Sequence, residues 1–159
     1  MKIERASLGD MEAIMTIYRG AVEFMKRTNN PNQWIDGYPS RELLERDITL
    51  GQLFVCRADE RIVAVFCHII GDDATYAQID GQWLNDEPYG TVHRIASSGE
   101  VSRIADFCLE WCFVQHPNQR IDTHADNTVM QRVILRNGYK ECGTIICSNG
   151  TPRVAYQRV

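Results

Sequence analysis

The sequence predicts an α/β fold in which a mixed, mostly antiparallel central sheet is flanked by helices on both faces. Three observations support this prediction. Strand-like segments come in pairs around short turns, once before the middle of the chain and once at its end. Two segments with helical spacing of apolar residues precede the first pair. Between the two pairs strands alternate with helices, and such crossovers place helices against a sheet that is partly parallel.

The first third of the chain predicts one strand and then two helices. Residues 2–6 alternate in polarity, as a short strand does. Ser7 is a good N-cap, and apolar side chains follow it at helical spacing as far as Thr28. Ser40 caps a second helix, which Gly51 closes because glycine adopts the backbone conformation of a helix end.

The middle of the chain predicts a hairpin, a polar excursion and another strand. Residues 52–58 and 61–70 are rich in apolar and β-branched side chains, and Asp59-Glu60 between them forms a turn. Residues 71–90 are mostly polar and favour turns. Residues 91–96 return to a strand pattern.

The last part of the chain predicts two crossovers and a final hairpin. Asp126 or Asn127 caps one of the helices, and Gly138 closes it with a left-handed C-cap. A turn over residues 148–151 joins the last two strands. The expected elements are a helix over 101–116, a strand over 120–125, a helix over 127–138 and strands over 139–147 and 152–159.

Composition favours a cytoplasmic globular protein. The 159 residues are 44% apolar, which is enough for one core, so we expect one domain over residues 1–159. The net charge of −4 without a basic block argues against a nucleic-acid partner. No apolar run approaches the roughly 18 residues of a membrane helix. The first residues lack the apolar stretch of a secretory signal, so no membrane contact is expected.

Two groups of residues raise the question of a metal site, and neither predicts one. The six cysteines form no C-x-x-C motif and lie mostly among apolar residues, as buried thiols do in a reducing compartment. Cys108 and Cys112 share a helix face but lack the two further ligands of structural zinc. Asp122, His124 and Asp126 would suit a metal hydrolase, but hydrolase motifs hold two or more histidines and this cluster has one. We therefore expect no metal, with a metal hydrolase as an alternative.

The second half of the chain carries motifs of a known family. They are the strand HRIAS, the helix RIADFCLEWC, the strand and turn RIDTHADN, and the helix and strand MQRVILRNGYKECG. Together with the element order over nearly the whole chain, these motifs resemble the GNAT family of acyl-CoA-dependent N-acyltransferases. Asn127 matches the family's Asn near the start of a helix, and Gly138-Tyr139 match its Gly-aromatic pair.

The resemblance implies that acetyl-CoA is the co-substrate and that a turn before a helix binds its pyrophosphate. The N-terminus of a helix offers unpaired N–H donors and a partial positive charge, and a preceding turn adds further N–H groups. The strand before this turn would supply backbone N–H groups for the thioester carbonyl. The residues implied in coenzyme binding are Ile95, Ala96, Gly99, Glu100, Val101, Ser102, Arg103, Ile104, Ala105 and Asn127.

Two features depart from the family pattern. The usual loop reads Gln/Arg-x-x-Gly-x-Gly/Ala, whereas here Glu100 stands at the first of these positions and Arg103 at the first glycine. Glu100 would repel a pyrophosphate if its side chain turned inward. Ile134 stands where the family often has a Tyr that protonates the leaving thiolate. These departures leave a non-catalytic acyl-CoA-binding module as the alternative to an enzyme.

Two histidines are candidate catalytic residues. His124 comes at the carboxyl end of a predicted strand, where ligands gather in α/β sheets, and its imidazole would accept a proton from an amine. His93 lies on the strand from which the family often takes its general base. Asp122 shares a side with His124, where it would orient that ring or, as the favoured alternative, be a partly exposed strand carboxylate. The structural alternatives are a His124 that bonds to the neighbouring turn and a His93 within the core or a cleft.

The acceptor predicted from the resemblance is a primary amine of a small molecule or a peptide, which would attack the thioester directly. Trp34 and Tyr38, in the loop between the first two helices, would form an aromatic wall for it. The alternative for these two side chains is a hydrophobic plug over the core. The last hairpin would allow a homodimer by pairing across two chains.

Overall fold

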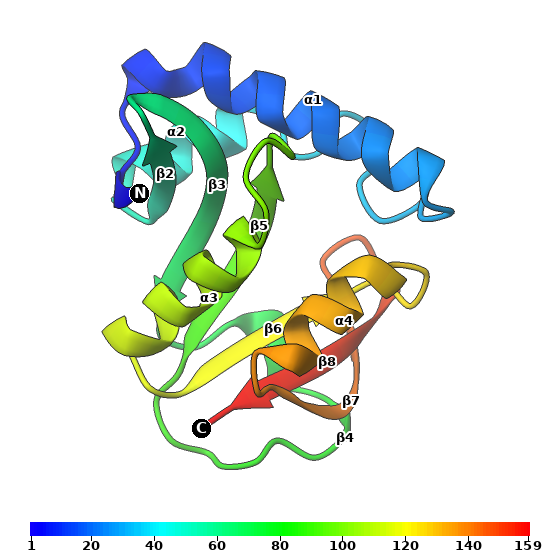
Figure 1. Ribbon diagram of the computed structural model, residues 1–159. Helices are drawn as coiled ribbons and strands as arrows, with labels where there is room; N and C mark the ends of the chain where they lie inside the picture. Colours follow the sequence, from blue (N-terminus) through cyan, green and yellow to red (C-terminus); the bar gives the residue numbers. More distant parts are fainter.

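The computed structural model describes residues 1–159 and contains one eight-stranded sheet with helices on both faces (Figure 1). The order across the sheet is β1-β2-β3-β5-β6-β8-β7-β4. Only β5 and β6 pair in parallel, so the predicted mixed, mostly antiparallel sheet is confirmed. The strands are β1 (Lys2–Arg5), β2 (Leu53–Ala58), β3 (Arg61–Ile70), β4 (Asp80–Gly81), β5 (Gly90–Ser97), β6 (Gln119–Thr123), β7 (Lys140–Ile146) and β8 (Pro152–Arg158).

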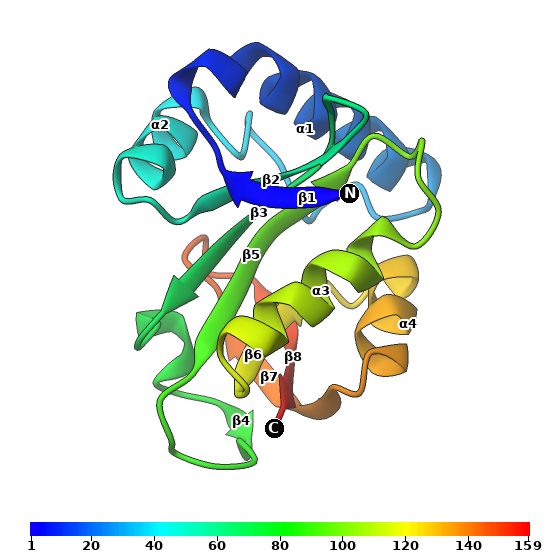
Figure 2. The same ribbon diagram turned by 60° about the vertical axis from the view of Figure 1, so that its left-hand side comes forward.

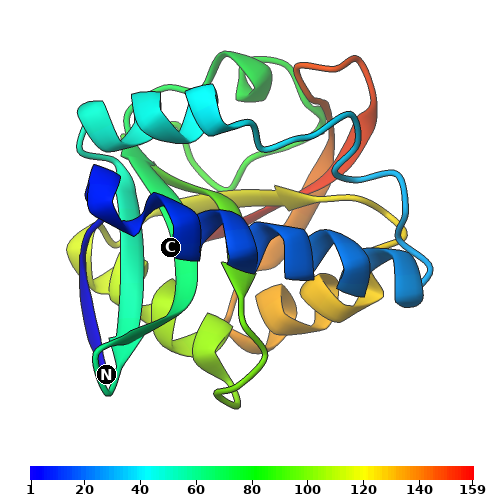
Figure 3. The same cartoon turned by 90° about the horizontal axis from the view of Figure 1, so that it is seen from above.

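Four α-helices and two short 3₁₀ helices cover the sheet. They are η1 (Leu8–Asp10), α1 (Met11–Arg27), α2 (Arg41–Thr49), η2 (Ala74–Tyr76), α3 (Ile104–Gln115) and α4 (Thr128–Arg136). Seen from above, α1 and α2 run side by side, and Arg41 of α2 pairs with Glu12 of α1 at 2.8 Å (Figure 3). None of the helices is both long and apolar enough to cross a bilayer.

Alternating side chains of the central strands pack against different helices. Val55 and Val65 lie in the cluster that α1 and α2 cover. Their neighbours Cys56 and Phe66 lie in the cluster that α3 and α4 cover. Figure 2 shows α3 and α4 together on one side of the strands, with α1 and α2 beyond the sheet. The period-two pattern of a strand therefore gives each face its own core.

Most predicted boundaries agree with the structure to within a few residues, and three differ in ways that matter. The strand predicted over 120–125 ends at Thr123, so His124 lies in a turn. The helix predicted over 101–116 begins at Ile104 because Arg103 adopts a left-handed conformation. The strand β4 was not predicted, because two residues are too few to show a strand pattern. In the structure, Gly81 of β4 pairs with Gly143 of β7. A Cβ on Gly81 would lie 2.1 Å from a backbone oxygen, so only glycine allows this pairing.

The strands β5 and β6 separate soon after they meet. They pair only at Gly90–Gln119 and Thr91–Arg120, although both strands continue beyond this point. A β-bulge in β5 lies at the separation, since Val65 pairs with Ala96 while Cys67 pairs with His93. Two residues of β5 thus oppose one of β3, which bends and twists the strand locally. The separation creates space at the centre of the sheet.

Candidate active site

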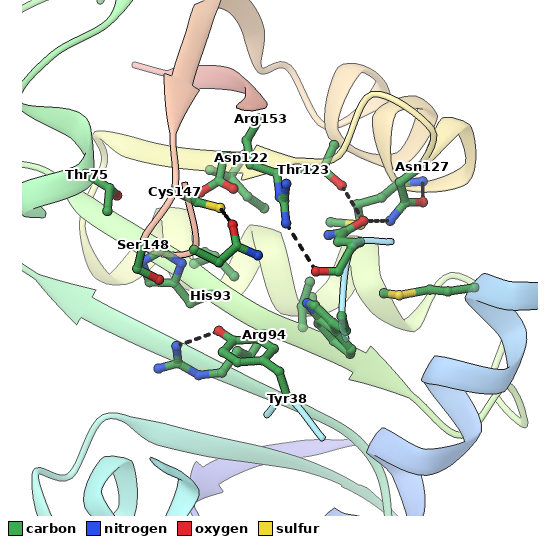
Figure 4. Close-up of a pocket in the computed structure, with 18 of the residues that line it drawn as sticks. Tyr38, Thr75, His93, Arg94, Asp122, Thr123, Asn127, Cys147, Ser148 and Arg153 are labelled. Atoms are coloured by element: carbon green, nitrogen blue, oxygen red, sulfur yellow. Dashed lines mark hydrogen bonds between the residues drawn. The ribbon is translucent and has the colours of Figure 1, made fainter. Parts of the chain in front are cut away.

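A cavity of about 620 Å³ lies where β5 and β6 separate (Figure 4). Its wall combines side chains of β5 and β6 with the loop between α1 and α2 and the turn between β7 and β8. Five of the predicted site residues line this cavity: Trp34, Tyr38, His93, Ile95 and Asn127. The separated strands and two loops therefore bring together residues that are far apart in the sequence.

His93 forms a hydrogen-bonded pair with Asp73 inside this cavity. Asp73 lies just before η2, and its Oδ2 is 2.7 Å from His93 Nε2. Burial alone would raise the pKa of Asp73, but hydrogen bonds from His93 and Thr75 outweigh it and lower this pKa to about 2. The carboxylate is therefore ionised at neutral pH and accepts the Nε2 proton. The other ring nitrogen of His93, Nδ1, has no hydrogen-bond partner in the protein and faces the cavity wall unengaged.

Asp73 is a functional candidate that the sequence did not reveal. It lies in the polar stretch over 71–90, twenty residues before His93. The only signal in the sequence was the spacing of Asp73 and Thr75. In the structure, the Asp73 side chain accepts hydrogen bonds from the N–H and the hydroxyl of Thr75, as an Asp does at the start of a helical turn. That pattern predicts a turn but gives no indication of a histidine partner.

His124 lies outside the cavity, in the turn between β6 and α4. Its Nδ1 accepts a hydrogen bond from the backbone N–H of Asp126 at 3.0 Å, so this lone pair is engaged. Asp122 does line the cavity, but its Oδ2 accepts from the Tyr76 hydroxyl at 2.7 Å and does not orient His124. The structure therefore matches the alternatives considered for both residues: Asp122 is a partly exposed strand carboxylate, and His124 bonds to the neighbouring turn because the strand ends before it. These two residues and Asp126 do not converge on one point that could hold a metal.

The aromatic residues of the loop between α1 and α2 both cover the core and line the cavity. Trp34 packs against Tyr18 of α1 with ring centroids 5.6 Å apart, and so covers the core. Trp34 and Tyr38 also line the cavity. The Tyr38 hydroxyl accepts from Arg94 at 3.2 Å, and Arg94 pairs with the buried Asp47 at 2.7 Å. The loop is thus attached to the bulged strand β5.

A second cavity of about 220 Å³ lies between β5, the start of α3 and α4. Seven residues implied in coenzyme binding line it, whereas Gly99, Glu100 and Ser102 do not. The seven residues are Ile95, Ala96, Val101, Arg103, Ile104, Ala105 and Asn127. The turn that resembles the family's pyrophosphate loop therefore opens onto a cavity.

The geometry of this turn explains its departures from the family pattern. Arg103 has φ 58°, the left-handed conformation that favours glycine, and it stands where the family has a glycine. The backbone at this position therefore takes a conformation that glycine would adopt without strain. The carboxylate of Glu100 pairs with Arg61 at 3.0 Å and lies outside the cavity. The repulsion that an inward-facing Glu100 would cause is thus avoided. Arg103 and Arg136 also line the cavity, and both pair with Asp106, so these three side chains together add one net positive charge beside it.

The two cavities meet at Ile95, Asn127 and Met130, which line both of them. Asn127 caps α4 by accepting from the Met130 N–H at 3.0 Å. Its amide Nδ2 donates to Gln33 of the α1–α2 loop at 2.8 Å. A linear molecule that enters beside α3 would pass this junction and present its end to the cavity of His93. The residues present fit a molecule with an anionic head and a long uncharged arm.

Ile134 is not at the junction. Its side chain is fully buried in the core formed with α3 and the central strands. In the sequence, Ile134 stands where the family often has a tyrosine as proton donor. In the structure, this position faces neither cavity. The α4 side that borders both cavities carries Met130 instead.

No family model matches the chain, and no curated protein sequence matches it. Among solved structures, a GNAT-family acetyltransferase from Streptococcus agalactiae is 32% identical with a TM-score of 0.91, over 99% of this chain and 94% of that one.

Two more distant structures share the fold. A ribosomal-protein-alanine N-acetyltransferase from Brucella melitensis is 16% identical with a TM-score of 0.65, over 100% of this chain and 99% of that one. The GNAT-like decarboxylase GphF, in complex with isobutyryl-CoA, is 12% identical with a TM-score of 0.67, over 100% and 99%.

Proposed function

The chain belongs to the GNAT family of acetyltransferases, and on this premise we propose that it transfers an acetyl group from acetyl-CoA to a primary amine of a small molecule or peptide. One observation carries the proposal. The cavity at the start of α3 meets the cavity of the His93–Asp73 pair at Ile95, Asn127 and Met130. Donor and acceptor would therefore reach each other at one point of the separated strands.

Binding of the coenzyme would rest on backbone groups and on two arginines. The first N–H groups of α3 have no partner within the helix, and the left-handed Arg103 directs the turn before them. Arg103 and Arg136 would add positive charge near the pyrophosphate. The fold neighbour that holds isobutyryl-CoA supports an acyl-CoA as the donor.

The transfer would proceed by direct attack of the amine nitrogen on the thioester carbonyl carbon. A C–N bond forms, the C–S bond breaks, and the electron pair leaves with the sulfur as a thiolate. His93 Nδ1 would accept the proton that the amine loses, with Asp73 stabilising the imidazolium that results. Backbone N–H groups of the bulged strand near Ile95 would stabilise the negative charge on the carbonyl oxygen. The thiolate then takes up a proton to give free coenzyme A.

Two measurements on the purified chain test this proposal. Titration calorimetry with acetyl-CoA should show saturable binding to one site. An assay of free coenzyme A release with a panel of primary amines should then show transfer that depends on the amine. If acetyl-CoA does not bind at millimolar concentration, the proposal is wrong.

The atypical turn favours a second candidate, a non-catalytic acyl-CoA-binding module. Arg103 replaces the family's glycine, and Ile134 replaces its tyrosine without facing either cavity. The same two measurements separate the candidates, because this module would bind acetyl-CoA and release no coenzyme A with any amine. The ionised Asp73 beside His93 favours the enzyme, since a module that only binds has no use for an oriented base.

A further inference from the structure

Arg153, at the start of β8, is a buried cation in the wall of the larger cavity. The residue is 5% exposed, and it lines the cavity that also holds His93. No Asp or Glu oxygen lies within 4.0 Å of its guanidinium. Arg94 lines the same cavity but is paired with Asp47 at 2.7 Å. An unpaired buried charge is unfavourable, so Arg153 lacks the anion that its position calls for.

The hydrogen bonds of Arg153 leave part of its guanidinium free. Nη1 donates to Thr151 Oγ1 at 2.6 Å and to the Pro152 carbonyl at 3.0 Å, and Nη2 donates to the Gln33 carbonyl at 3.1 Å. All three acceptors are neutral. The N–H of Nε and one N–H of Nη2 have no acceptor in the protein. These two groups belong to the planar fork that holds both oxygens of a carboxylate.

Another buried arginine without a carboxylate shows that Arg153 is in a different situation. Arg120 lies between the rings of Trp83 and Tyr89, at 4.1 and 3.9 Å from their centroids. These aromatic faces stabilise its charge, and Arg120 lines neither cavity. Arg153 has no aromatic ring over it and faces open space.

The wall around Arg153 also carries acidic groups. Asp122 pairs in register with Ala155, so it stands on the same face of the sheet as Arg153 at a diagonal position. In Figure 4 Arg153 enters the cavity from the side of β8, and His93 enters from the side of β5. A ligand that carries both a positive and a negative group matches this wall.

We propose that Arg153 binds a carboxylate of the acceptor, so that the substrate is an amine that also carries a carboxylate group, such as an amino acid. The fork of Arg153 holds the carboxylate, and the amine extends toward His93 at the junction of the cavities. This inference rests on the proposed acetyl transfer for its amine, but the carboxylate site itself is a binding property.

The test is calorimetry on the protein loaded with coenzyme A, with amino acids and their carboxamides as ligands. Each pair differs only in the carboxylate. The acid should bind about tenfold or more tightly than its amide, as expected for a charge-assisted bidentate contact. In R153K and R153M this difference should disappear. R158K is the matched control, because Arg158 lies on the same strand but pairs with Glu110 at 2.7 Å outside both cavities.

Several results would overturn the inference. Equal affinity for acid and amide, no binding of either, or a preference for the acid that survives in R153M would each show that Arg153 does not bind a carboxylate. Tighter binding of an aminoalkylphosphonate or of inorganic phosphate would assign the site to phosphate instead. If R153M does not fold, R153K and the comparison of acid with amide in the wild type still decide.

The result for Arg153 can be distinguished from the result for the proposed acetyl transfer. Transfer to amines without preference for an acid would contradict the role of Arg153 alone. Selective binding of acids without transfer would contradict the proposed function alone. Where transfer occurs, R153K should raise KM for the acid about tenfold, leave kcat within about threefold and leave KM for the amide unchanged. A merely structural Arg153 would change both acceptors alike.

Discussion

At the scale of single residues, the proposed chemistry depends on one histidine that an aspartate orients. His93 Nε2 donates to the ionised Asp73, which fixes the tautomer and leaves Nδ1 to accept a proton. His124, by contrast, uses its Nδ1 lone pair for the backbone of Asp126. His93 thus has a ring nitrogen free to accept a proton, as a general base requires, whereas the Nδ1 of His124 is already engaged.

Replacing each of these two histidines with glutamine tests this difference. H93Q should lower kcat about 100-fold or more with acetyl-CoA and a good amine, because general-base catalysis is lost. H124Q is the matched control and should leave kcat within about twofold, since His124 lines neither cavity. Steady-state release of coenzyme A measures both. An H124Q variant as impaired as H93Q would contradict the assignment.

The family resemblance pointed to His93 as a candidate, but nothing in the sequence indicated that Asp73 pairs with it or that Arg153 lines the same cavity. Asp73 and Arg153 reach the cavity from a polar excursion and from the last strand. Contacts at such separations in sequence arise from tertiary folding, and no local periodicity encodes them. His124 lies outside the strand for a local reason: the strand ends at Thr123, two residues before its predicted end.

At the scale of elements, the turn before α3 is the segment on which the proposed binding of coenzyme A depends. Arg103 keeps φ 58° there, a conformation that costs an L-residue about 1–2 kcal/mol. In the proposed complex, backbone donors of this turn and of the first turn of α3 would bind the anion, so the identity of the side chain would matter less than the path of the chain.

A pair of substitutions tests this view of the turn. R103G should fold at least as stably as the wild type, because glycine accepts a positive φ, and it should still bind acetyl-CoA. R103V should lower the free energy of unfolding by about 1–2 kcal/mol and weaken binding, because a β-branched residue resists this conformation. Urea unfolding and calorimetry give the two quantities. Loss of binding in R103G together with unchanged binding in R103V would contradict the role of the backbone.

A prediction for α4 concerns Ile134, which stands at the position of the family's tyrosine. I134Y should not raise activity, because the side chain lies in the core and not at a cavity. It should lower the free energy of unfolding by about 1–3 kcal/mol through overpacking. I134V is the milder control, with a loss of about 0.5–1.5 kcal/mol. An active and stable I134Y would show that α4 faces the cavity differently.

Element types were predictable from the sequence, and the details that create the site were not. Caps at Ser40 and Asn127 accept the hydrogen bonds that their positions predict. The bulge at Arg94 and the two-residue strand β4 carry no periodic signal, because each depends on pairing with a distant strand. The sequence thus specifies where strands and helices lie, and tertiary pairing specifies where β5 and β6 separate.

At the scale of the whole molecule, partly buried carboxylates couple stability to pH. Asp106 at the start of α3 accepts from Arg136 of α4, and this hydrogen bond holds its pKa well below the ordinary value. Asp73 has a pKa of about 2. A carboxylate whose pKa is lower in the folded than in the unfolded chain stabilises the fold fully above the unfolded pKa. This contribution is lost as the pH falls through the folded pKa.

We therefore predict that the free energy of unfolding falls as the pH is lowered from about 4 toward 2. D106N cannot titrate at this position, so its stability should depend less on pH over the same range, although it is less stable at pH 7. Chemical unfolding at a series of pH values measures both curves. Parallel curves for wild type and D106N would show that Asp106 has the same pKa in both states.

The central claim is that acyl-CoA binds across the smaller cavity and presents its thioester to His93. A crystal structure of the chain with acetyl-CoA tests it most directly. We predict the pyrophosphate at the turn before α3 and the acetyl carbonyl beside Ile95, within reach of His93 Nδ1 once an amine is bound. Acetyl-CoA bound elsewhere, or with its thioester directed away from the larger cavity, would contradict the account.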